Sequence, residues 1–596
     1  MKKFVFSLII TVFASATLTA GPVGEATAAQ VASRFLSNEV VLVTDGPDGL
    51  YIFNDADGEG WVVISAEDSA MPILGYSDKG SFRTDSQPAN LRAWLGGYSR
   101  ELQKASQQHI AQNSEVKNLW KTAGYRTKSA EGKYLETPAY DQESPYNLKC
   151  PNVKESEITH QALTGCVATA MAEVIRYHQW PEKGTGTIGG YSYTSDYKQT
   201  IKVPSFDIDS HSYNYTLMPF SYSGSETTAQ NDAIAQLMYD CGVMVEASYN
   251  YKNGTGAFSE NIVSALSEHM GYSASAQHIY RQAYTDAEWT KLIQKEIDNG
   301  RPIIYSGVDG DGGGHQFVCD GYDTRDYIHI NWGWSGSNNG YFTLNLRIPG
   351  LYTFSEEQTM IVGLEPDKNG DTKAEASLMF EYYDDTHLGM SIASGSVPSK
   401  SFSINAGYIL NTSYSIIGST YVSTATYNGA VKAALLDYEG NLKEYISAEE
   451  EVNDIGGAEM FVIEKLECKI SGDVSFSDRV VLMYKTSDGS WQQIKGKDGL
   501  DYDDRTGAYN YVNMSSAIPA TDAAYILIPN GLKAGDTLYF ELLAGASPIS
   551  SISWYYDDVK QNGITANLSS GNHSLRAEVT FSDGSSESIS TEFTIE

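Results

Sequence analysis

Hydrophobic residues recur at helical spacing over residues 166–178, which is the clearest periodic stretch of the chain. The positions that form this face are Val167, Ala170, Met171, Val174, Ile175 and His178. Thr164 is the expected N-cap, and Trp180-Pro181 ends the pattern because proline cannot continue a helix. The pattern therefore predicts a helix that begins at Cys166.

Periodic patterns also predict the other elements between residues 22 and 366. Helices are expected over residues 26–36, 89–110, 229–241 and 259–270, and from Thr285, which forms a capping box with Glu288, to Gly300. Strands are expected over residues 50–53, 61–65, 73–76, 302–305, 316–320, 327–331 and 341–344. From residue 134 onward helices come first and antiparallel strands second, which is an α+β pattern.

Helical periodicity fades after residue 372, and alternation replaces it over residues 571–596. The alternating apolar positions are Leu575, Ala577, Val579 and Phe581, then Ile589, Phe593 and Ile595 after the turn Asp583-Gly584. This pattern predicts a hairpin with one buried face, and Trp554 can supply a core aromatic. The length predicts two all-β sandwich modules, at residues 372–500 and 510–596.

Residues 1–20 have the pattern of a signal peptide. Basic residues follow Met1, an apolar run extends from Phe4 to Ala14, and small residues stand at Ala16 and Ala20. The run is too short to span a membrane, and no later stretch reaches about 18 apolar residues. We therefore expect an exported protein that is secreted, periplasmic or held at the cell surface.

Charge and cysteine usage exclude several classes of partner. The formal net charge is -34 over 596 residues, without a basic block, which argues against binding to nucleic acid or to anionic membranes. The five cysteines and the histidines, His329 among them, show no metal-ligand spacing, and residues 308–314 and 367–371 lack the spacing of a calcium loop. We expect no metal and no cofactor. The odd number of cysteines indicates a free thiol and leaves open a disulfide among the other four.

Cys166 lies where a helix start activates a thiol. The unpaired N–H groups and the helix dipole favour an anion there, so the pKa of the thiol should fall. A thiolate at this position can attack a carbonyl carbon. Taken alone, however, the stretch fits a small buried cysteine at a helix start at least as well.

A second stretch, residues 312–336, supplies the partner that a nucleophile needs. Three glycines lead into His315 at a strand start, and the next strand ends in Asn331-Trp332. A thiol nucleophile requires a base that takes its proton and a group that orients the base. His315 fits the first role, and Asn331 or Trp332 fits the second.

In combination these stretches resemble a streptopain-type cysteine peptidase of the papain-like clan. The matching segments are residues 165–170, 314–318 and 329–334, with a further match at Tyr140-Asp141-Gln142 and Pro145-Tyr146-Asn147. The resemblance implies a papain-like catalytic domain at residues 133–366, made of a helical part and an antiparallel sheet. It also implies that residues 21–132 are an α+β prosegment that covers the cleft until it is removed.

The resemblance assigns a catalytic role to each matching residue. Cys166 would be the nucleophile, and His315 would be the general base and then the general acid. Gln142 and the backbone N–H of Cys166 would donate to the oxyanion. Asn331 and Trp332 would lie behind the histidine, and the orienting role stays open between them.

Two glycines match positions that contact substrate. Gly314 precedes the histidine, and Gly256 falls in the variable loop 253–257, where the family has a small residue in its specificity pocket. The family also suggests a preference for an apolar side chain two residues before the cut bond. The small, polar and charged stretch 122–133 is typical of a processing site.

We therefore expect a secreted cysteine endopeptidase made as a zymogen, which acts on proteins or peptides and is inhibited by its own prosegment. One alternative is acyl transfer to an amine at the same site, as in transglutaminase-like enzymes. Another is a surface-binding adhesin whose cysteine and histidine have no catalytic role. New amino termini would identify hydrolysis, and unusual thiol reactivity would exclude the adhesin.

Overall fold

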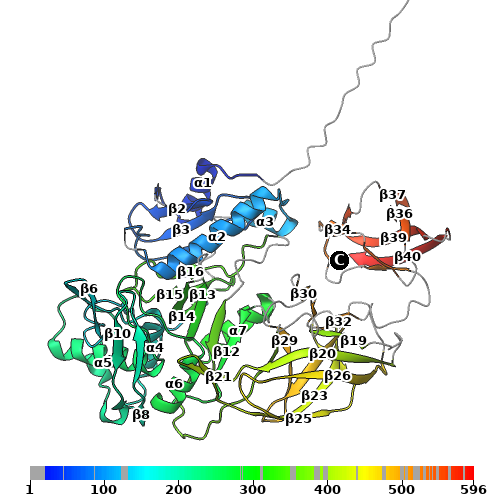
Figure 1. The fold of residues 1–596 in the computed structure, drawn as a ribbon. Coiled ribbons are helices and arrows are strands. Elements are labelled where there is room, and N and C mark those ends of the chain that lie inside the picture. Colours follow the sequence, from blue (N-terminus) through cyan, green and yellow to red (C-terminus); the bar gives the residue numbers. More distant parts are fainter. Residues whose placement is uncertain are drawn as a thin grey trace, which may run out of the picture. The chain divides into compact units, whose positions relative to one another are not determined.

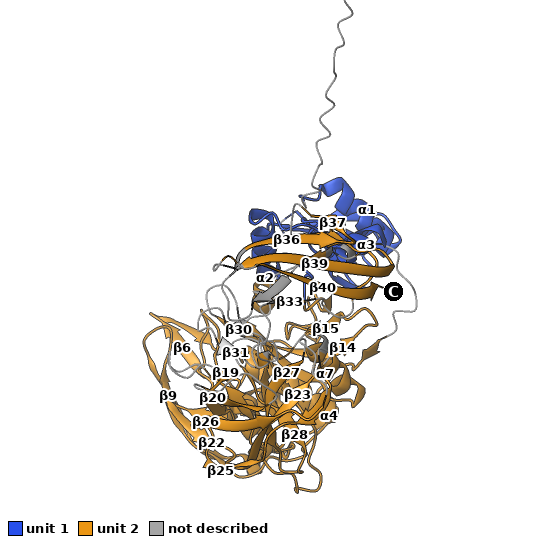
Figure 2. Ribbon diagram, turned by 90° about the vertical axis from the view of Figure 1, so that its right-hand side faces the viewer, with its two compact units in different colours: residues 1–84, 95–127, 345–354 blue, residues 85–94, 128–344, 355–596 orange. Residues whose placement is uncertain are grey.

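The computed structural model describes residues 21–122, 132–308, 313–348, 358–381, 389–393, 401–472, 478–496 and parts of 502–595, without residues 45, 86, 282, 283, 285, 438 and 439. The expected signal peptide, most of the stretch 122–133, the cap residue Thr285 and the turn residue Asp583 lie outside the described residues. The chain divides into two compact units (Figure 2). The first comprises residues 1–84, 95–127 and 345–354, and the second comprises residues 85–94, 128–344 and 355–596.

The first unit combines an antiparallel sheet with helices. Its elements, of which α2 begins in the second unit, are α1 (Glu25–Leu36), β1 (Val40–Leu42), β2 (Leu50–Asp55), β3 (Trp61–Ser65), β4 (Ile73–Ser77), α2 (Ala89–Gln107) and α3 (Ser114–Thr122). Strands β1 to β4 pair in chain order. The buried face of α1, which includes Val31 and Phe35, packs on this sheet. The helices and strands expected in this region are confirmed.

The central body, residues 132–344 and 355–366, belongs to the second unit. Its helices are α4 (Cys166–His178), α5 (Thr228–Met244), α6 (Asn261–Met270) and α7 (Asp286–Asp298), with 3-10 turns η1 (Ile208–Ser210) and η2 (Tyr215–Leu217). Its strands are β5 (Lys133–Tyr134), β6 (Asn152–Glu155), β7 (Ile158–Gln161), β8 (Thr187–Ile188), β9 (Tyr191–Thr194), β10 (Thr200–Val203), β11 (Phe206–Asp207), β12 (Gln277–Tyr280), β13 (Ile303–Val308), β14 (Gly314–Tyr322), β15 (Ile328–Asn331), β16 (Gly340–Phe342) and β17 (Thr359–Val362). The expected helices and strands are present, with small differences at their ends.

The sheet of the central body separates two layers of helices. Its strand order is β16-β15-β14-β13-β17-β12, neighbouring strands in this order run antiparallel, and β5 pairs with β14. Ile304, Val318 and Ile361, on one face, belong to the hydrophobic core that α4, α5 and α6 build. Figure 1 shows α4 beside β14. On the other face, Tyr305 packs against Trp289 of α7, with 6.0 Å between the ring centroids. Because strand side chains alternate, α4 and α7 cover opposite faces of this sheet.

The first β module is a sandwich. Its strands are β18 (Leu378–Phe380), β19 (Met390–Ile392), β20 (Ser401–Asn411), β21 (Tyr414–Ile417), β22 (Thr420–Ser423), β23 (Tyr427–Leu436), β24 (Leu442–Tyr445), β25 (Glu450–Ile455), β26 (Met460–Lys469), β27 (Arg479–Lys485), β28 (Trp491–Gln493), β29 (Lys495–Gly496), β30 (Tyr502–Asp503), β31 (Ala508–Tyr509) and β32 (Val512–Asn513). One sheet is built around β20 and the other around β23. Ile404 of the first sheet and Leu482 of the second share one core, which also includes Val512.

The second β module has a separate core. Its strands are β33 (Ala524–Leu527), β34 (Thr537–Tyr539), β35 (Glu541–Ala544), β36 (Ile549–Tyr556), β37 (Val559–Lys560), β38 (Thr565–Asn567), β39 (Gly571–Phe581) and β40 (Ser586–Ile595). The order β37-β36-β39-β40 forms a four-stranded sheet. Leu575, Ala577 and Val579 are buried together with Trp554, as the alternation predicted. Strands β39 and β40 pair as the expected hairpin.

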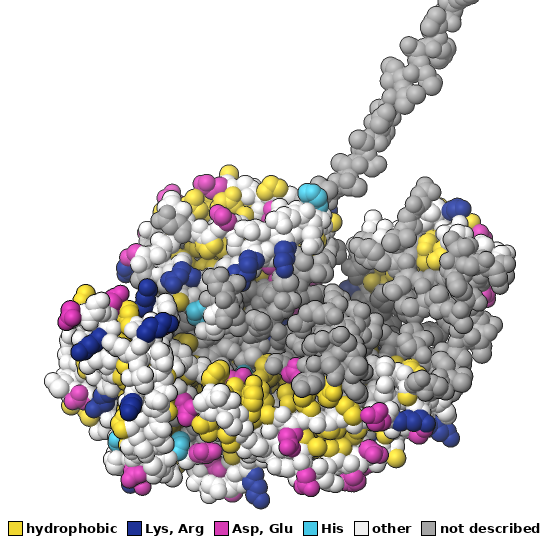
Figure 3. Space-filling model, in the orientation of Figure 1, with side chains coloured by type: hydrophobic (Ala, Val, Ile, Leu, Met, Phe, Trp, Pro, Cys, Tyr) yellow, Lys and Arg dark blue, Asp and Glu magenta, His cyan; other side chains and the backbone are white. Residues whose placement is uncertain are grey.

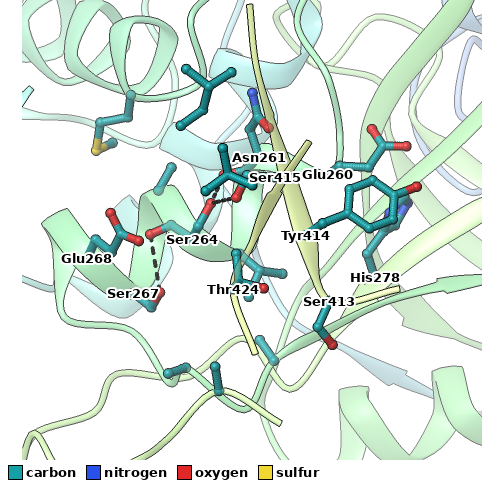
Figure 4. A pocket seen from close by; sticks show the side chains of 18 of the residues that line it. Glu260, Asn261, Ser264, Ser267, Glu268, His278, Ser413, Tyr414, Ser415 and Thr424 are labelled. Carbon is teal, nitrogen blue, oxygen red and sulfur yellow. Dashed lines mark hydrogen bonds between the residues drawn. The ribbon is translucent and has the colours of Figure 1, made fainter. Parts of the chain in front are cut away.

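The hairpin β21–β22 joins the first β module to α6 of the central body. The side-chain amide of Asn261 donates to the Ile416 carbonyl at 2.7 Å and accepts from the Ile416 N–H at 2.6 Å. The hydroxyls of Ser264 and Ser415 lie 2.8 Å apart (Figure 4). A cavity of about 650 Å³ opens beside these contacts. This cavity is lined by both the central body and the hairpin, and Cys166 is not among its lining residues.

Candidate active site

Gly165 sets the backbone geometry from which α4 begins at Cys166. Its φ angle is 89°, and a Cβ there would lie 2.8 Å from the Thr255 carbonyl oxygen, so glycine is required. The expectation that Thr164 caps the helix is wrong, because Gly165 is the N-cap residue. The Thr164 hydroxyl instead lies 2.9 Å from that of Thr169, inside the structure. The chain thus turns sharply and brings Cys166 to the first position of the helix.

The thiol of Cys166 is free and half-buried. Burial raises the pKa of the thiol, and hydrogen bonding to the backbone N–H groups of Gln316 and Val167 lowers it by less. The expected fall in pKa is therefore wrong for this structure. The physical reason is that a thiolate removed from water loses more hydration than these N–H groups restore.

Strand β14 brings His315 close to the start of α4. His315 is half-buried, opposes Gly307 of β13, and precedes Gln316, whose N–H reaches the Cys166 thiol. Because side chains alternate along a strand, His315 shares a face of the sheet with Phe317. Residue 315 is thus the neighbour of a residue that contacts the thiol, while the His315 side chain of the candidate dyad lies on the opposite face of β14 from the core that α4 builds.

Gln142 lies beside the chain that enters α4. Its carbonyl accepts a hydrogen bond of 3.1 Å from the Thr164 N–H, and its side chain is buried. Its own N–H donates to the Asp141 carboxylate at 2.6 Å. Since Thr164 is two residues before Cys166, this hydrogen bond fixes the segment of Gln142 next to the nucleophile.

Asn331 and Trp332 have different surroundings. The Asn331 amide donates to the Pro138 carbonyl at 2.7 Å and so holds the segment that leads to Gln142. The Trp332 ring packs on Phe317, with 4.9 Å between the ring centroids, and so lies on the face of the sheet that His315 shares. These contacts favour Trp332 as the residue that shields the histidine.

The two glycines expected to contact substrate are both exposed. Gly256 forms a β-bridge with Ser248, and the adjacent Thr255 touches Gly165 at the start of α4. A Cβ added at Gly256 or at Gly314 would meet no atom within 4 Å. The structure therefore places Gly256 near Cys166 with open space in front of it.

Two residues at the start of α2 contact the active-site strands, and the sequence did not indicate them. The Asn90 amide is buried and donates to the Trp332 carbonyl at 2.7 Å and to the Gln316 carbonyl at 3.3 Å. The Trp94 ring lies 5.6 Å from that of Phe317 and 6.0 Å from that of Trp332. A lone asparagine or tryptophan has no spacing signature, and only their place on the apolar face of a long helix indicates burial.

The other cysteines are buried and free: Cys150, Cys241, Cys319 and Cys468. None of them forms a disulfide, which settles the possibility that the sequence left open. Burial raises the pKa of Cys150 and of Cys468 to about 12 in each case. These thiols are packing residues, whereas Cys166 is half-buried at the active site.

Several other charged groups pair with a neighbour among the described residues. His329 and Asp320 are 2.5 Å apart, so His329 has a local partner on the strands behind the site. Among the described residues, no cluster of histidine, cysteine or carboxylate side chains could hold a metal ion. No described helix is long and apolar enough to cross a membrane. Acidic and basic side chains are interspersed over the described part of the face in Figure 3.

Comparisons with protein families match two parts of the chain. The model of the peptidase C10 family matches residues 140–342, which contain Cys166 and His315. The model of the Spi protease inhibitor matches residues 20–102, which contain Asn90 and Trp94.

Individual relatives extend this similarity. Streptopain of Streptococcus pyogenes is 32% identical over 336 residues, which cover 53% of this chain and 81% of that protein. The thiol protease/hemagglutinin PrtT of Porphyromonas gingivalis is 31% identical over 397 residues, and the match spans 62% of this chain but only 45% of that relative.

Two solved structures are similar to part of the chain. A fragment of Prevotella intermedia prointerpain A has 30% identity and a TM-score of 0.45, and it covers 55% of this chain and 98% of that fragment. Active interpain A has 34% identity and a TM-score of 0.34, and it covers 39% of this chain and 96% of that structure.

Proposed function

The chain belongs to the peptidase C10 family of cysteine peptidases, and from this premise we propose that it is an exported endopeptidase made as a zymogen. The signal-peptide pattern of residues 1–20 supports export. The observation that carries the activity is the meeting of α4 and β14. The backbone N–H of Gln316, next to His315, reaches the thiol at the start of the nucleophile helix.

The proposed reaction proceeds through an acyl-enzyme. His315 takes the proton of the Cys166 thiol, and the thiolate attacks the scissile carbonyl carbon. Gln142 and the Cys166 N–H donate to the oxyanion, and each such donor contributes roughly 10²–10³ in rate in other enzymes. His315 then protonates the leaving amine, and water releases the acyl group.

Substrate recognition is proposed at the two exposed glycines. Gly314 lets the substrate backbone pass close to His315. Gly256 leaves room beside Cys166 for a side chain of the substrate, and an apolar one is expected there. Support comes from the open space in front of both glycines and from the contact of Thr255 with Gly165.

The prosegment is proposed as the inhibitor of its own peptidase. Asn90 is hydrogen-bonded to the backbone of Gln316, and Trp94 packs on the aromatic face that His315 shares through Phe317. While these side chains stay in place, the surroundings of His315 are occupied. Removal of the prosegment frees that face, and with it the movement that His315 needs to reach the thiol.

A time course of the purified full-length chain beside Cys166→Ala tests this proposal. Intact mass and peptidase activity are followed under mild reductant. We expect only the wild type to lose its prosegment, near residues 122–133, and to gain activity as it does so. Amide transfer without new amino termini would favour acyl transfer instead. An inactive wild type, even after an external protease removes the prosegment, would contradict the peptidase proposal.

A further inference from the structure

Helix α4 carries a buried carboxyl on the same face as Cys166. Glu173 is fully buried, and it follows Cys166 by seven residues, which is about two helical turns. A charged residue in the middle of a helix usually faces solvent. Its burial below the nucleophile therefore calls for a specific role.

One oxygen of Glu173 holds the segment that carries the oxyanion donor. Its Oε1 accepts a hydrogen bond of 3.1 Å from the Tyr140 N–H, and both residues are buried. The Tyr140 carbonyl accepts from the Ser335 N–H at 2.7 Å. The Gln142 carbonyl accepts from the Thr164 N–H. Three hydrogen bonds thus hold residues 140–142, and Glu173 of α4 accepts one of them.

Glu173 also faces the end of β15. The side chain of Asn331 interacts with its carboxyl, and the Asn331 amide donates to Thr137 at 3.1 Å and to Pro138 at 2.7 Å. The carboxyl therefore lies where α4, the segment from Thr137 to Gln142 and β15 meet. A change in its charge would act on all three segments.

The surroundings of Glu173 favour its neutral form. Burial raises the pKa of Glu173 well above the ordinary value, the Tyr140 N–H and Asn331 lower it, and Asp320 and Asp141 raise it. Its Oε2 has no hydrogen-bond partner among the described residues, and neither has the Arg176 Nη1 one turn further on.

The remaining titratable groups of the junction are also buried or half-buried. The rings of Tyr140 and Tyr146 lie 5.5 Å apart, and Tyr222 packs against both. The charge of Arg176 lowers the pKa of Tyr140, whereas that of Glu173 raises it. An ionised Glu173 would thus lie among buried or half-buried side chains, where its charge has little hydration.

We propose that Glu173 is a positioning residue that acts in its neutral form: it holds Tyr140 to Gln142 against the nucleophile helix, and its ionisation destabilises this junction because the charge would be buried without hydration. The inference rests on the proposed function, because Gln142 is the residue positioned. The stabilisation is complete at pH values below the pKa of the unfolded chain. It declines as pH rises toward the higher pKa of the folded chain.

Two reactions of the processed full-length enzyme separate this role from a general effect on the fold. Peptide hydrolysis needs the oxyanion donors, whereas alkylation of Cys166 by iodoacetamide forms no oxyanion. Both rates are measured between about pH 5 and pH 9, the range into which burial moves a carboxyl pKa. The variants are Glu173→Gln, Glu173→Ala and, as a control, Glu296→Gln, a buried carboxylate paired with Arg301 on α7.

Glu173→Gln keeps a neutral side chain at every pH. At low pH we expect its ratio of hydrolysis rate to alkylation rate to match that of the wild type within about twofold. At alkaline pH this ratio should fall in the wild type but not in Glu173→Gln. Glu173→Ala should lower that ratio by about 10² or less at every pH, the scale of one lost oxyanion donor. Glu296→Gln should leave the ratio unchanged.

Two results would overturn the role of Glu173 alone. One is an alkaline decline in Glu173→Gln that equals that of the wild type. The other is a Glu173→Ala enzyme that loses thermal stability but keeps the wild-type ratio. A wild type that is alkylated but hydrolyses no peptide would overturn the proposed function, and this inference with it.

Discussion

Two segments of the second unit contact the central body through a buried asparagine. At the start of α2, the Asn90 amide donates to the carbonyls of Trp332 and Gln316, on the active-site strands themselves. At the start of α6, the Asn261 amide pairs with both backbone groups of Ile416 in the β21–β22 hairpin. In each case an asparagine side chain forms hydrogen bonds with backbone groups of another segment.

The two contacts differ in their distance from the dyad. Asn90 binds the backbone of Gln316, the residue after His315. The hairpin contacts α6, and its link to Gln316 is indirect. The Gln316 side chain donates to the hydroxyl of Ser259, just before α6, at 2.7 Å. Loss of the first contact should therefore change activity, whereas loss of the second should mainly change stability.

The largest effect is expected from Trp94→Ala in the full-length chain. Removing this ring from the aromatic face of Phe317 and Trp332 should weaken docking of the prosegment by about 3–5 kcal/mol. Intact mass should then show much faster loss of the prosegment than in the wild type. Trp120→Ala is the control, because its indole N–H binds Ala70 within the first unit. Equal acceleration in both variants would mean that any loss of prosegment stability speeds its removal, and that the Trp94 contact has no specific role.

Asn90→Ala should have the next largest effect. It leaves the carbonyls of Gln316 and Trp332 without the Asn90 donor, at a cost of about 1–3 kcal/mol for each buried group left unpaired. Processing of the full-length chain should accelerate by about tenfold or more, as measured by intact mass. Lys104→Ala, on an exposed position of the same helix, should process at the wild-type rate. If Asn90→Ala behaved like Lys104→Ala, the direct contact would have no inhibitory role.

Asn261→Ala should lower stability and leave activity nearly intact. It leaves both backbone groups of Ile416 unpaired, which should lower the free energy of unfolding by about 1–3 kcal/mol. Thermal unfolding would show this loss, while kcat/KM should stay within about threefold of the wild type. Ser264→Ala, which removes the hydroxyl that contacts Ser415 and the Asn261 carbonyl, should lower stability by less than Asn261→Ala does. A large loss of kcat in Asn261→Ala would show that the module controls the site directly.

Ser259→Ala should produce the smallest change. The Gln316 side-chain N–H would lose the Ser259 hydroxyl as its acceptor, and the Gln316 Oε1 has no hydrogen-bond partner among the described residues. We expect a decrease of a few-fold in kcat with an unchanged KM if Gln316 acts only by supporting the strand of His315. Steady-state kinetics with one peptide substrate measure both constants. An increase in KM with an unchanged kcat would instead place Ser259 in a substrate pocket.

Local signals predicted the framework of the site well. The apolar spacing after Cys166 gave α4 with its first residue, and the glycines before His315 marked the start of β14 within two residues. These features depend on neighbours in the sequence, so a period or a turn residue reveals them. The family resemblance added Gln142, which no periodic pattern indicates.

Features that depend on tertiary packing were not predictable in this way. The pKa of Cys166 was expected to fall, but burial by distant segments raises it. Glu173 has no signal of its own in the sequence, and only the fold places Tyr140 and Asn331 around it. Thr164 looked like a cap, but its N–H is used by Gln142. In each case the outcome depends on residues that are distant in the sequence or on the course of the folded backbone.

The distribution of the five thiols has a practical consequence for counting molecules. Four are sealed in hydrophobic cores, and the half-buried one is the proposed nucleophile. A reagent that modifies accessible thiols should therefore take up one equivalent per folded chain and more when the cores open. The stoichiometry of labelling then reports, in one titration, how many molecules of a preparation are folded and able to react.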